Sequence, residues 1–374
     1  MKINESGIYA HRLEKLRKDL HDRSIDTFWV LNEENRQYLS GFRGHDGQCD
    51  ESAGALFIAQ SRQLLTTDSR YIEQAGNEAP SFEPLCYTKG IIDLLPGILK
   101  DLKTERLGFE AGRLSYLQFQ KVSEALQKSG ISVDLVPCEG MVEGLRIIKE
   151  DFEIEAIKRS IAITELALTA ILNGLAPGMS EKDVAWSIER EIRERGAEEV
   201  SFSPIVASGE NSALPHAIPA DRKIKSGEPI LFDLGSRLDG YCSDMSRTVI
   251  LGKPDTKFRN VIQAVYDAQQ RAIESIKAGV SSKSVDKVAR DHIDKKGFKG
   301  KFGHGLGHGV GLAVHEKPAL NPTHDIILEP GMVVTVEPGI YIPGWGGVRL
   351  ENMVVVQEKR AEVLNKMPVL LFDK

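Results

Sequence analysis

Three histidines lie close together in one glycine-rich stretch of the sequence. The stretch GHGLGHGVGLAVHE spans residues 303–316 and contains His304, His308 and His315. Its glycines disfavour a helix, and we expect a loop whose flexible backbone can come close to bound metals. A neutral imidazole is a common ligand of divalent metals, so one of the three could belong to a metal site.

Two aspartates in the middle of the chain are spaced to share one face of a β-hairpin. The segment DLGSRLDGYCSD runs from Asp233 to Asp244, and its Asp-Gly pair at 239–240 is a strong signal for a two-residue hairpin turn. A turn centred there places the two carboxylates on facing strands, two positions from direct opposition. Because side chains alternate along a strand, both then project from the same face.

Two glutamates repeat this arrangement later in the chain. The segment EPGIYIPGWGGVRLE separates Glu337 from Glu351, and we expect Gly344, Gly346 and Gly347 to provide the bend between their strands. Four carboxylates on two related hairpins would repel one another strongly unless cations lay between them. Two divalent metals about 3.5–4 Å apart, with bridging carboxylates and a nitrogen ligand, would remove this repulsion.

Each of these features also has an ordinary explanation. An aspartate on a strand usually faces solvent, a single histidine is more often packed or on the surface, and many glycine-rich segments are only loops. We favour the metal site because the hairpins and the histidine cluster would otherwise be separate coincidences. The chain has no P-loop and no G-x-G-x-x-G motif, and His304 and His308 lack the helix and glutamate of the H-E-x-x-H zinc motif.

Composition excludes several classes of protein. The chain has 374 residues, of which 41% are apolar, so it can bury the cores of two domains. A net charge of −6 with interspersed signs offers no basic surface for nucleic acid. No apolar run approaches the roughly 18 residues of a membrane span, and the first residues lack a signal-peptide pattern, so we expect no membrane partner. The four cysteines lie far apart in the sequence without a paired motif such as C-x-x-C, so we expect free thiols and a cytoplasmic protein. They are Cys49, Cys86, Cys138 and Cys242.

The elements that carry these residues fall into two regions, and we place the boundary near residue 140. In residues 1–140, the runs TFWVLN, GALFIA and QLLTTD read as strands, and LSYLQFQKVSEALQKSG reads as a helix that stops at Gly130. This alternation predicts a small α/β domain. Residues 141–374 begin with a long amphipathic helix that ends at Gly174. Its apolar stripe is Ile154, Ile157, Ile161, Leu168 and Leu172.

The second region contains an internal repeat. Residues 178–197, GMSEKDVAWSIEREIRERGA, align without gaps with residues 279–298, GVSSKSVDKVARDHIDKKGF. Each copy predicts a helix with a serine N-cap, Ser180 or Ser281, and a closing glycine. Capped helices resemble one another by chance, but each copy is also followed by a strand that ends in one of the carboxylates named above. The repeat therefore favours a duplicated domain whose halves both contribute ligands.

At these residues the chain resembles the proline-specific peptidases of the pita-bread metallopeptidase fold, the Xaa-Pro aminopeptidases and Xaa-Pro dipeptidases (prolidases). FDLGSRLDGYCSDMSRT is similar to the family's first ligand hairpin, GHGLGHGVGLAVHEKP to its histidine loop, and VVTVEPGIY and GVRLENMVVV to its glutamate strands. NRQYLSGFRGHDG and LLTTDSRYIEQA are similar to its N-terminal domain. The resemblance implies an α/β (α+β) protein with a creatinase-type N-terminal domain. Its pita-bread domain would have two pseudo-symmetric halves around a curved, mainly antiparallel sheet.

The resemblance also implies roles for individual residues. The implied metal ligands, with Asp244 and Glu351 bridging, are Asp233, Asp244, His308, Glu337 and Glu351. The segment SFSPIVASGENSALPHAIP would present His216 to the scissile amide. His315 would hydrogen-bond the charge that develops on the carbonyl oxygen or the leaving group. Glu337 would carry a proton from water to the departing nitrogen.

For His304, Arg349 and the identity of the metal, more than one interpretation stays open. His304 either lies behind a ligand or in the substrate pocket, or it only packs in its loop. Arg349, on the same strand face as Glu351, either contacts a ligand or anchors substrate, or it forms a plain surface ion pair. Four oxygens and one nitrogen suit Mn²⁺ or Co²⁺, which we favour, and also Zn²⁺ or Fe²⁺.

The implied function is hydrolysis of the bond before proline in short proline-containing peptides. We expect an Xaa-Pro aminopeptidase, with an Xaa-Pro dipeptidase (prolidase) as the alternative. A non-catalytic peptide-binding protein on this fold, or a metal-free creatinase-type hydrolase, should have lost ligands, and here all five positions are intact. The resemblance also implies a homodimer in which the N-terminal domain makes dimer contacts and controls access to the other subunit's site.

Overall fold

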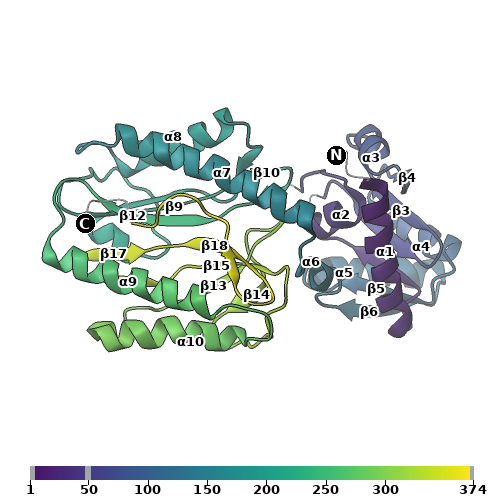
Figure 1. The fold of residues 1–374 in the computed structure, drawn as a ribbon. Coiled ribbons are helices and arrows are strands. Elements are labelled where there is room, and N and C mark those ends of the chain that lie inside the picture. Colours follow the sequence, from purple (N-terminus) through teal and green to yellow (C-terminus); the bar gives the residue numbers. More distant parts are fainter. Residues whose placement is uncertain (1–4, 47–51, 371–374) are drawn as a thin grey trace. The chain divides into compact units, whose positions relative to one another are not determined.

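The protein is described here by a computed structural model, which covers residues 5–46 and 52–370 and divides into two compact units, residues 1–146 and 147–374 (Figure 1). Cys86, Cys138 and Cys242 are free thiols, and Cys49 lies outside the described residues. Among the described helices, none is both long and apolar enough to cross a bilayer.

The first unit is a six-stranded mixed sheet with helices packed against it. The strand order is β4-β3-β2-β1-β5-β6, in which β1 is antiparallel to β2 and parallel to β5. The predicted strands are β1, β2 and β3, and the predicted helix is α5, which ends at Gly130 with a φ of 68°. In chain order the elements are α1 (Glu5–Asp22), β1 (Thr27–Val30), α2 (Glu33–Ser40), β2 (Ala55–Ala59), β3 (Gln63–Thr67), α3 (Ile72–Glu78), β4 (Glu83–Cys86), α4 (Ile91–Asp101), β5 (Arg106–Glu110), α5 (Tyr116–Ser129), β6 (Asp134–Cys138) and α6 (Glu143–Arg146).

The second unit is built from antiparallel strand pairs and four long helices. All strand pairings found among its described residues are antiparallel, in sheets ordered β12-β9-β8, β14-β13-β15-β18-β19, β11-β10-β7 and β16-β17. In chain order the elements are α7 (Asp151–Gly174), α8 (Glu181–Glu194), β7 (Glu199–Val200), β8 (Ile205–Ser208), the 3₁₀ helix η1 (Gly209–Ala213), β9 (Pro229–Leu234), β10 (Ser236–Leu238), β11 (Tyr241–Cys242), β12 (Met245–Ile250), α9 (Thr256–Ser275), α10 (Ser282–Ile293), the π-helical turn η2 (Asp294–Phe298), β13 (Gly307–Gly309), β14 (Glu316–Leu320), β15 (Val333–Val336), β16 (Gly339–Ile342), β17 (Gly346–Arg349), β18 (Asn352–Val356) and β19 (Ala361–Val363).

The two halves of this unit repeat one plan, in which two helices are followed by antiparallel strands. In Figure 1, α7 and α8 lie on one side of the strands, and α9 and α10 lie on the other. Each helix pair closes its own core: Leu168 and Ile188 pack with Phe232, whereas Val265 and Val285 pack in a second cluster with strands of the second half. These separate cores leave the strands of the two halves to meet between the helical layers.

Backbone hydrogen bonds reproduce the sequence repeat. Ser180 caps α8 and bridges to Lys223, and Ser281 caps α10 and bridges to Ile327. Each cap precedes a helix whose end is followed by a glycine with positive φ, as the alignment predicts. The duplication is therefore visible in the backbone as well as in the sequence.

The register of the first ligand hairpin is the predicted one. Asp239 and Gly240 have φ angles of 51° and 80°, which a type I′ turn requires, and Ser246 lies opposite Asp233. In the second hairpin, Gly344 lies in the bend with a φ of 76°. Gly347 belongs to β17 instead, where a Cβ atom would lie 2.0 Å from the Ser212 carbonyl oxygen. The prediction that Gly346 and Gly347 form the bend was wrong, because close approach of another backbone is what requires a glycine at 347.

Gly235, between the two aspartates of the first hairpin, offers a test of this packing. A Cβ atom there would lie 1.9 Å from the Ser243 carbonyl oxygen. We expect Gly235→Ala to lower the free energy of unfolding by about 1–3 kcal/mol in urea titration, because the hairpin must shift. Gly174→Ala, at the end of α7 with no atom within 4 Å of the added Cβ, is the control and should change stability by less than about 0.5 kcal/mol. Equal effects of the two substitutions would contradict this account.

Candidate metal centre

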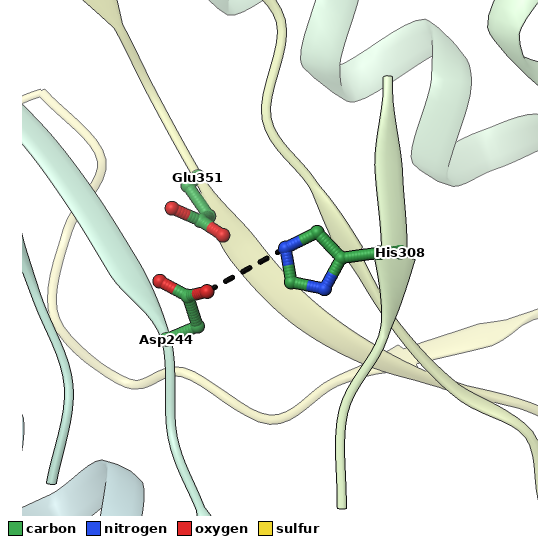
Figure 2. Close-up of side chains that lie close together, drawn as sticks. All are labelled: Asp244, His308 and Glu351. Atoms are coloured by element: carbon green, nitrogen blue, oxygen red, sulfur yellow. Dashed lines mark ion pairs between the residues drawn. The ribbon is translucent and has the colours of Figure 1, made fainter. Parts of the chain in front are cut away.

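Three side chains from both halves of the second unit meet at one point. Asp244 precedes β12, Glu351 precedes β18, and His308 lies within β13. Each offers one ligand atom, and these atoms lie within 4.8 Å of one another. Figure 2 shows the two carboxylates facing the His308 ring, whose Nε2 lies 3.6 Å from Asp244 Oδ2.

Backbone and side-chain hydrogen bonds between the halves bring these residues together. The Glu351 amide donates to the Ser246 carbonyl oxygen at 3.1 Å. The Thr248 hydroxyl donates to the Arg349 carbonyl oxygen at 3.0 Å and accepts the Arg349 amide at 3.1 Å. β12 of the first half is thus bonded side by side to the segment that leads into β18 of the second. We call this line of contacts the seam, and it sets Asp244 beside Glu351.

The carboxylates at the seam are strongly perturbed. Burial and the charge of Glu351 raise the pKa of both Asp244 and Glu337 well above the usual range. Burial and the charge of Asp233 raise the pKa of Glu351 to about 8. This is the repulsion that the sequence predicts, and protons or cations must offset it.

His308 presents a bare nitrogen to these carboxylates. Its backbone amide donates to Thr335 Oγ1 at 3.0 Å, and its ring Nδ1 lies 3.1 Å from the Gly309 carbonyl oxygen. A carbonyl only accepts, so Nδ1 carries the hydrogen in the neutral ring and Nε2 keeps its lone pair. Burial and the neighbouring His315 lower the His308 pKa to about 4. A lone pair that faces carboxylate oxygens is favourable only with a proton or a metal cation between them.

The remaining two predicted ligands lie at the edge of this group. Glu337 Oε1 is 3.4 Å from His308 Nε2 and accepts from the Thr335 hydroxyl at 3.3 Å. Asp233 Oδ2 is bonded to Arg349 Nη2, while its Oδ1 is buried without a hydrogen-bond partner. Glu351 Oε1 is buried and unpartnered in the same way. Two orphaned carboxylate oxygens and a free imidazole nitrogen are a donor set that suits divalent metal.

Arg349 begins a buried chain of hydrogen bonds. It is 3% exposed, so it is not a surface ion pair. Its guanidinium donates to Asp233, to Ser246 Oγ at 2.8 Å and to Tyr341 Oη at 2.9 Å. His304 Nδ1 contacts its neighbour's carbonyl oxygen, so Nε2 accepts from Tyr341 Oη at 2.8 Å. Burial and the charge of Arg349 lower the His304 pKa to about 4, which keeps the ring neutral in this role.

The two other histidines predicted for the site, His216 and His315, are exposed. The His315 ring centroid lies 4.3 Å from that of His308. The charge of His216 contributes to the lowered pKa of both His304 and His315, so His216 lies near both rings, in a loop of the first half. Burial is nevertheless the main cause of the lowered His315 pKa.

Sequence reasoning missed three residues that orient the site: Ser246, Thr335 and Tyr341. Ser246 donates to Glu351 Oε2 at 2.7 Å and accepts from Arg349, so it links the two halves. The one available signal was its position directly opposite Asp233 in the predicted hairpin. Thr335 bonds to His308, and Tyr341 bonds to His304, each from another strand. No local sequence pattern predicts such contacts.

Two glycines of the histidine stretch, Gly307 and Gly309, are packed against the backbone of neighbouring strands. A Cβ atom at Gly307 would lie 2.1 Å from the Thr335 carbonyl oxygen, and one at Gly309 would lie 2.3 Å from the Lys317 carbonyl oxygen. The expectation that glycine lets the backbone approach the metals remains a prediction, and the structure gives these glycines a packing role. The small residues let β13 fit between its neighbours, which sets the depth of His308.

Comparisons with known proteins agree with this geometry. The chain matches the model of metallopeptidase family M24 over residues 155–358 and that of the creatinase/prolidase N-terminal domain over residues 12–148. It is 37% identical over 355 residues to the Xaa-Pro dipeptidase of Pyrococcus furiosus, covering 95% of this chain and 97% of the relative. The solved Xaa-Pro dipeptidase from Bacillus anthracis is 39% identical with a TM-score of 0.90, covering 97% and 99% of the two chains. The X-Pro aminopeptidase from Thermotoga maritima is 38% identical with a TM-score of 0.86, covering 96% and 99%.

The raised carboxyl pKa values predict how the metal-free protein responds to pH. Folded Glu351 holds its proton up to about pH 8, whereas the unfolded chain releases it near 4.5, so the free energy of unfolding falls as pH rises through this window. The lowered histidine pKa values act in the opposite direction, but only below 6.5. We therefore expect the melting temperature of chelator-treated protein to fall between about pH 6.5 and about pH 8.

Scanning calorimetry with and without Mn²⁺ measures this effect. Glu110 in the first unit has a pKa raised by burial to about 7 and acts in the same direction, so Glu351→Gln is the necessary control. This variant should show a shallower fall than the natural protein. A melting temperature that is flat or rises over this range in the metal-free protein would exclude protonated carboxyls at the seam.

Proposed function

Because the chain belongs to metallopeptidase family M24 and carries a creatinase/prolidase N-terminal domain, we propose that it is an Xaa-Pro dipeptidase (prolidase). The predicted family and the pita-bread fold are confirmed, and the chain is a metallopeptidase that uses divalent metal ions. The observation that carries the proposal is the meeting of Asp244, His308 and Glu351 from two halves, in a chain 39% identical to a solved Xaa-Pro dipeptidase.

The relatives change which of the two proline-specific activities we prefer. The sequence alone led us to expect the aminopeptidase, with the dipeptidase as the alternative. The relatives from P. furiosus and B. anthracis are both named Xaa-Pro dipeptidases, and this supports the alternative better. The T. maritima structure, named an X-Pro aminopeptidase, keeps that activity as the second candidate.

We assign the metal ligands to the five residues that the resemblance implies. As the resemblance implies, Asp244 and Glu351 would serve both ions, His308 would supply one nitrogen ligand, and Asp233 and Glu337 would complete the set. When bound, the two ions supply Lewis acidity for the scissile carbonyl and make water a better nucleophile near neutral pH. With four carboxylates and one imidazole, we prefer Mn²⁺ or Co²⁺ to Zn²⁺ or Fe²⁺.

The other residues would bind substrate and move protons. His216 and His315 are exposed, and His315 lies beside His308. Their ring N–H groups would donate to the scissile carbonyl oxygen or the proline nitrogen. Glu337 would take a proton from the attacking water and deliver it to the departing imino nitrogen. Arg349 and His304 do not need to touch substrate, because their hydrogen bonds hold Asp233 and Tyr341.

We also propose an oligomeric state and a cellular location. A homodimer, in which the N-terminal unit contacts the partner and limits access to its site, would appear in sedimentation analysis as twice the chain mass of 41.3 kDa. The free thiols of the described cysteines support a cytoplasmic location.

Peptide length separates the two candidate activities. The protein, stripped of metal and reloaded with Mn²⁺, should be assayed on matched Xaa-Pro, Xaa-Pro-Xaa and longer peptides, with Xaa-Ala peptides as controls. We expect rapid cleavage of the Xaa-Pro dipeptide, little of the longer peptides, and none without metal. Preferential cleavage of longer peptides would establish the aminopeptidase instead. Equal cleavage of the Xaa-Ala series would refute proline specificity altogether.

Substitution of two neighbouring histidines separates ligands from substrate-binding groups. His308→Ala should release metal, because a ligand is lost, whereas His315→Ala should retain both ions. Loss of the His315 donor should lower kcat by roughly 10²–10³-fold. Metal analysis and kcat of the folded variants give the answer. Equal loss of metal in both variants would show that His315 is a ligand.

A further inference from the structure

The loop that carries His216 is unusually well anchored for an exposed segment. We call residues 209–219 the His216 loop. It follows β8, begins with the 3₁₀ helix η1 and ends just before Ala220. His216 is exposed and lies in a turn closed by a 3.2 Å bond from the Ala217 amide to the Leu214 carbonyl oxygen. Short-range bonds of this kind do not by themselves fix a loop relative to the rest of the fold.

One buried carboxylate, that of Glu181, gathers both ends of the His216 loop. Glu181 opens α8 and is 0% exposed. At the start of the loop, its Oε1 accepts from the Ser208 amide at 2.7 Å and the Ser208 hydroxyl at 2.8 Å. At the end of the loop, its Oε2 accepts from the Ala220 amide at 3.1 Å, and the Asn211 side-chain amide lies 3.0 Å from the same oxygen. A buried carboxylate with so many donors is costly to replace.

The residue that corresponds to Glu181 in the second half of the repeat has fewer hydrogen bonds. In the repeat, Glu181 aligns with Ser282, which is also fully buried at the start of its helix. Ser282 Oγ accepts one backbone amide, that of Ile326, at 3.1 Å. The helix and cap are the same in both halves, but only the first half places a long carboxylate there. The additional bonds of Glu181 all go to the His216 loop and its ends.

The seam holds the same loop from the opposite side. Arg349 Nη1 donates to the carbonyl oxygen of Pro215, the residue before His216, at 3.1 Å. The Gly347 amide donates to Ser212 Oγ at 2.8 Å. His216 therefore lies between two anchors, one on the ligand side and one at Glu181.

We propose that Glu181 is a positioning residue for catalysis, because it fixes the loop in the one arrangement that directs His216 at the substrate. This inference rests on the proposed function, in which His216 donates to the reacting peptide. Glu181 acts through His216 and touches neither substrate nor metal. Misplacing a donor by about 1 Å costs up to about 10²-fold in rate, so a remote anchor can control kcat.

A double-mutant cycle in the Mn²⁺-loaded protein tests the proposal. Glu181→Gln keeps the volume but sets an amide N–H against donors, and we expect kcat on an Xaa-Pro dipeptide to fall about 10- to 100-fold with metal content unchanged. In a His216→Ala background the same substitution should cost less than about twofold, because the group it positions is gone. In a His315→Ala background it should retain its full effect. Equal costs in all three backgrounds would mean a general loss of structure and would overturn the proposal.

A matched control and a second readout complete the experiment. Ser282→Ala removes the equivalent contact in the other half and should leave kcat within about twofold. Hydrogen exchange of the Ser208 and Ala220 amides should accelerate in Glu181→Gln and remain unchanged in Ser282→Ala. If the natural protein cleaves no Xaa-Pro peptide, the proposed function fails, and exchange alone decides the anchoring role. Unchanged exchange in Glu181→Gln would refute it.

Discussion

Buried negative charge at the seam is the constraint on which the rest of the structure depends. Asp244, Glu337 and Glu351 are removed from water and set close to one another, and each has a pKa raised above its ordinary range. A cluster of this kind is stable only with protons or cations to compensate it. The neutral His308, with its lone pair toward the carboxylates, belongs to the same compensation. Hydrogen bonds from Ser246 and Thr335 fix the carboxylates but do not neutralise them.

Arg349 divides this charged region into two parts. Among the described residues, its guanidinium is the one buried cation bonded to the carboxylate of a predicted ligand, and it pairs with Asp233. It also bonds to the hydroxyl groups of Ser246 and Tyr341. The Tyr341 bond extends the chain to His304. Asp233 and His304 are thus held by one network of hydrogen bonds, so under the proposed function a substitution in this network would alter both metal affinity and substrate orientation.

Local sequence signals predicted the elements that carry the ligands. The Asp-Gly pair at 239–240 was enough to fix the register that places Asp233 opposite Ser246, because a type I′ turn leaves no freedom in pairing. Serine caps and closing glycines located the repeated helices. The individual ligand roles came from the family resemblance and remain proposals.

Long-range contacts were beyond the reach of these signals. The partners of Glu181 lie 27 to 39 residues away, and Arg349 reaches Pro215 across 134. Gly347 was misread, and the packing role of Gly307 was missed, for the same reason. A Cβ atom at either position would collide with a backbone carbonyl oxygen far along the chain, that of Ser212 in η1 or that of Thr335 in β15. A sequence pattern reports periodicity and turns, whereas such contacts depend on how finished elements pack.

The seam has a consequence for how the second unit can come apart. Asp233 and Asp244 belong to one half, and His308, Glu337 and Glu351 belong to the other, while each half keeps its own helical core. The connection between the halves is the short segment 251–255, between β12 and α9. A chain cut there would leave two fragments that each retain a core but hold only part of the ligand set. Divalent metal bound by ligands from both fragments would then stabilise the reassembled complex. Fragment complementation would therefore depend on metal concentration.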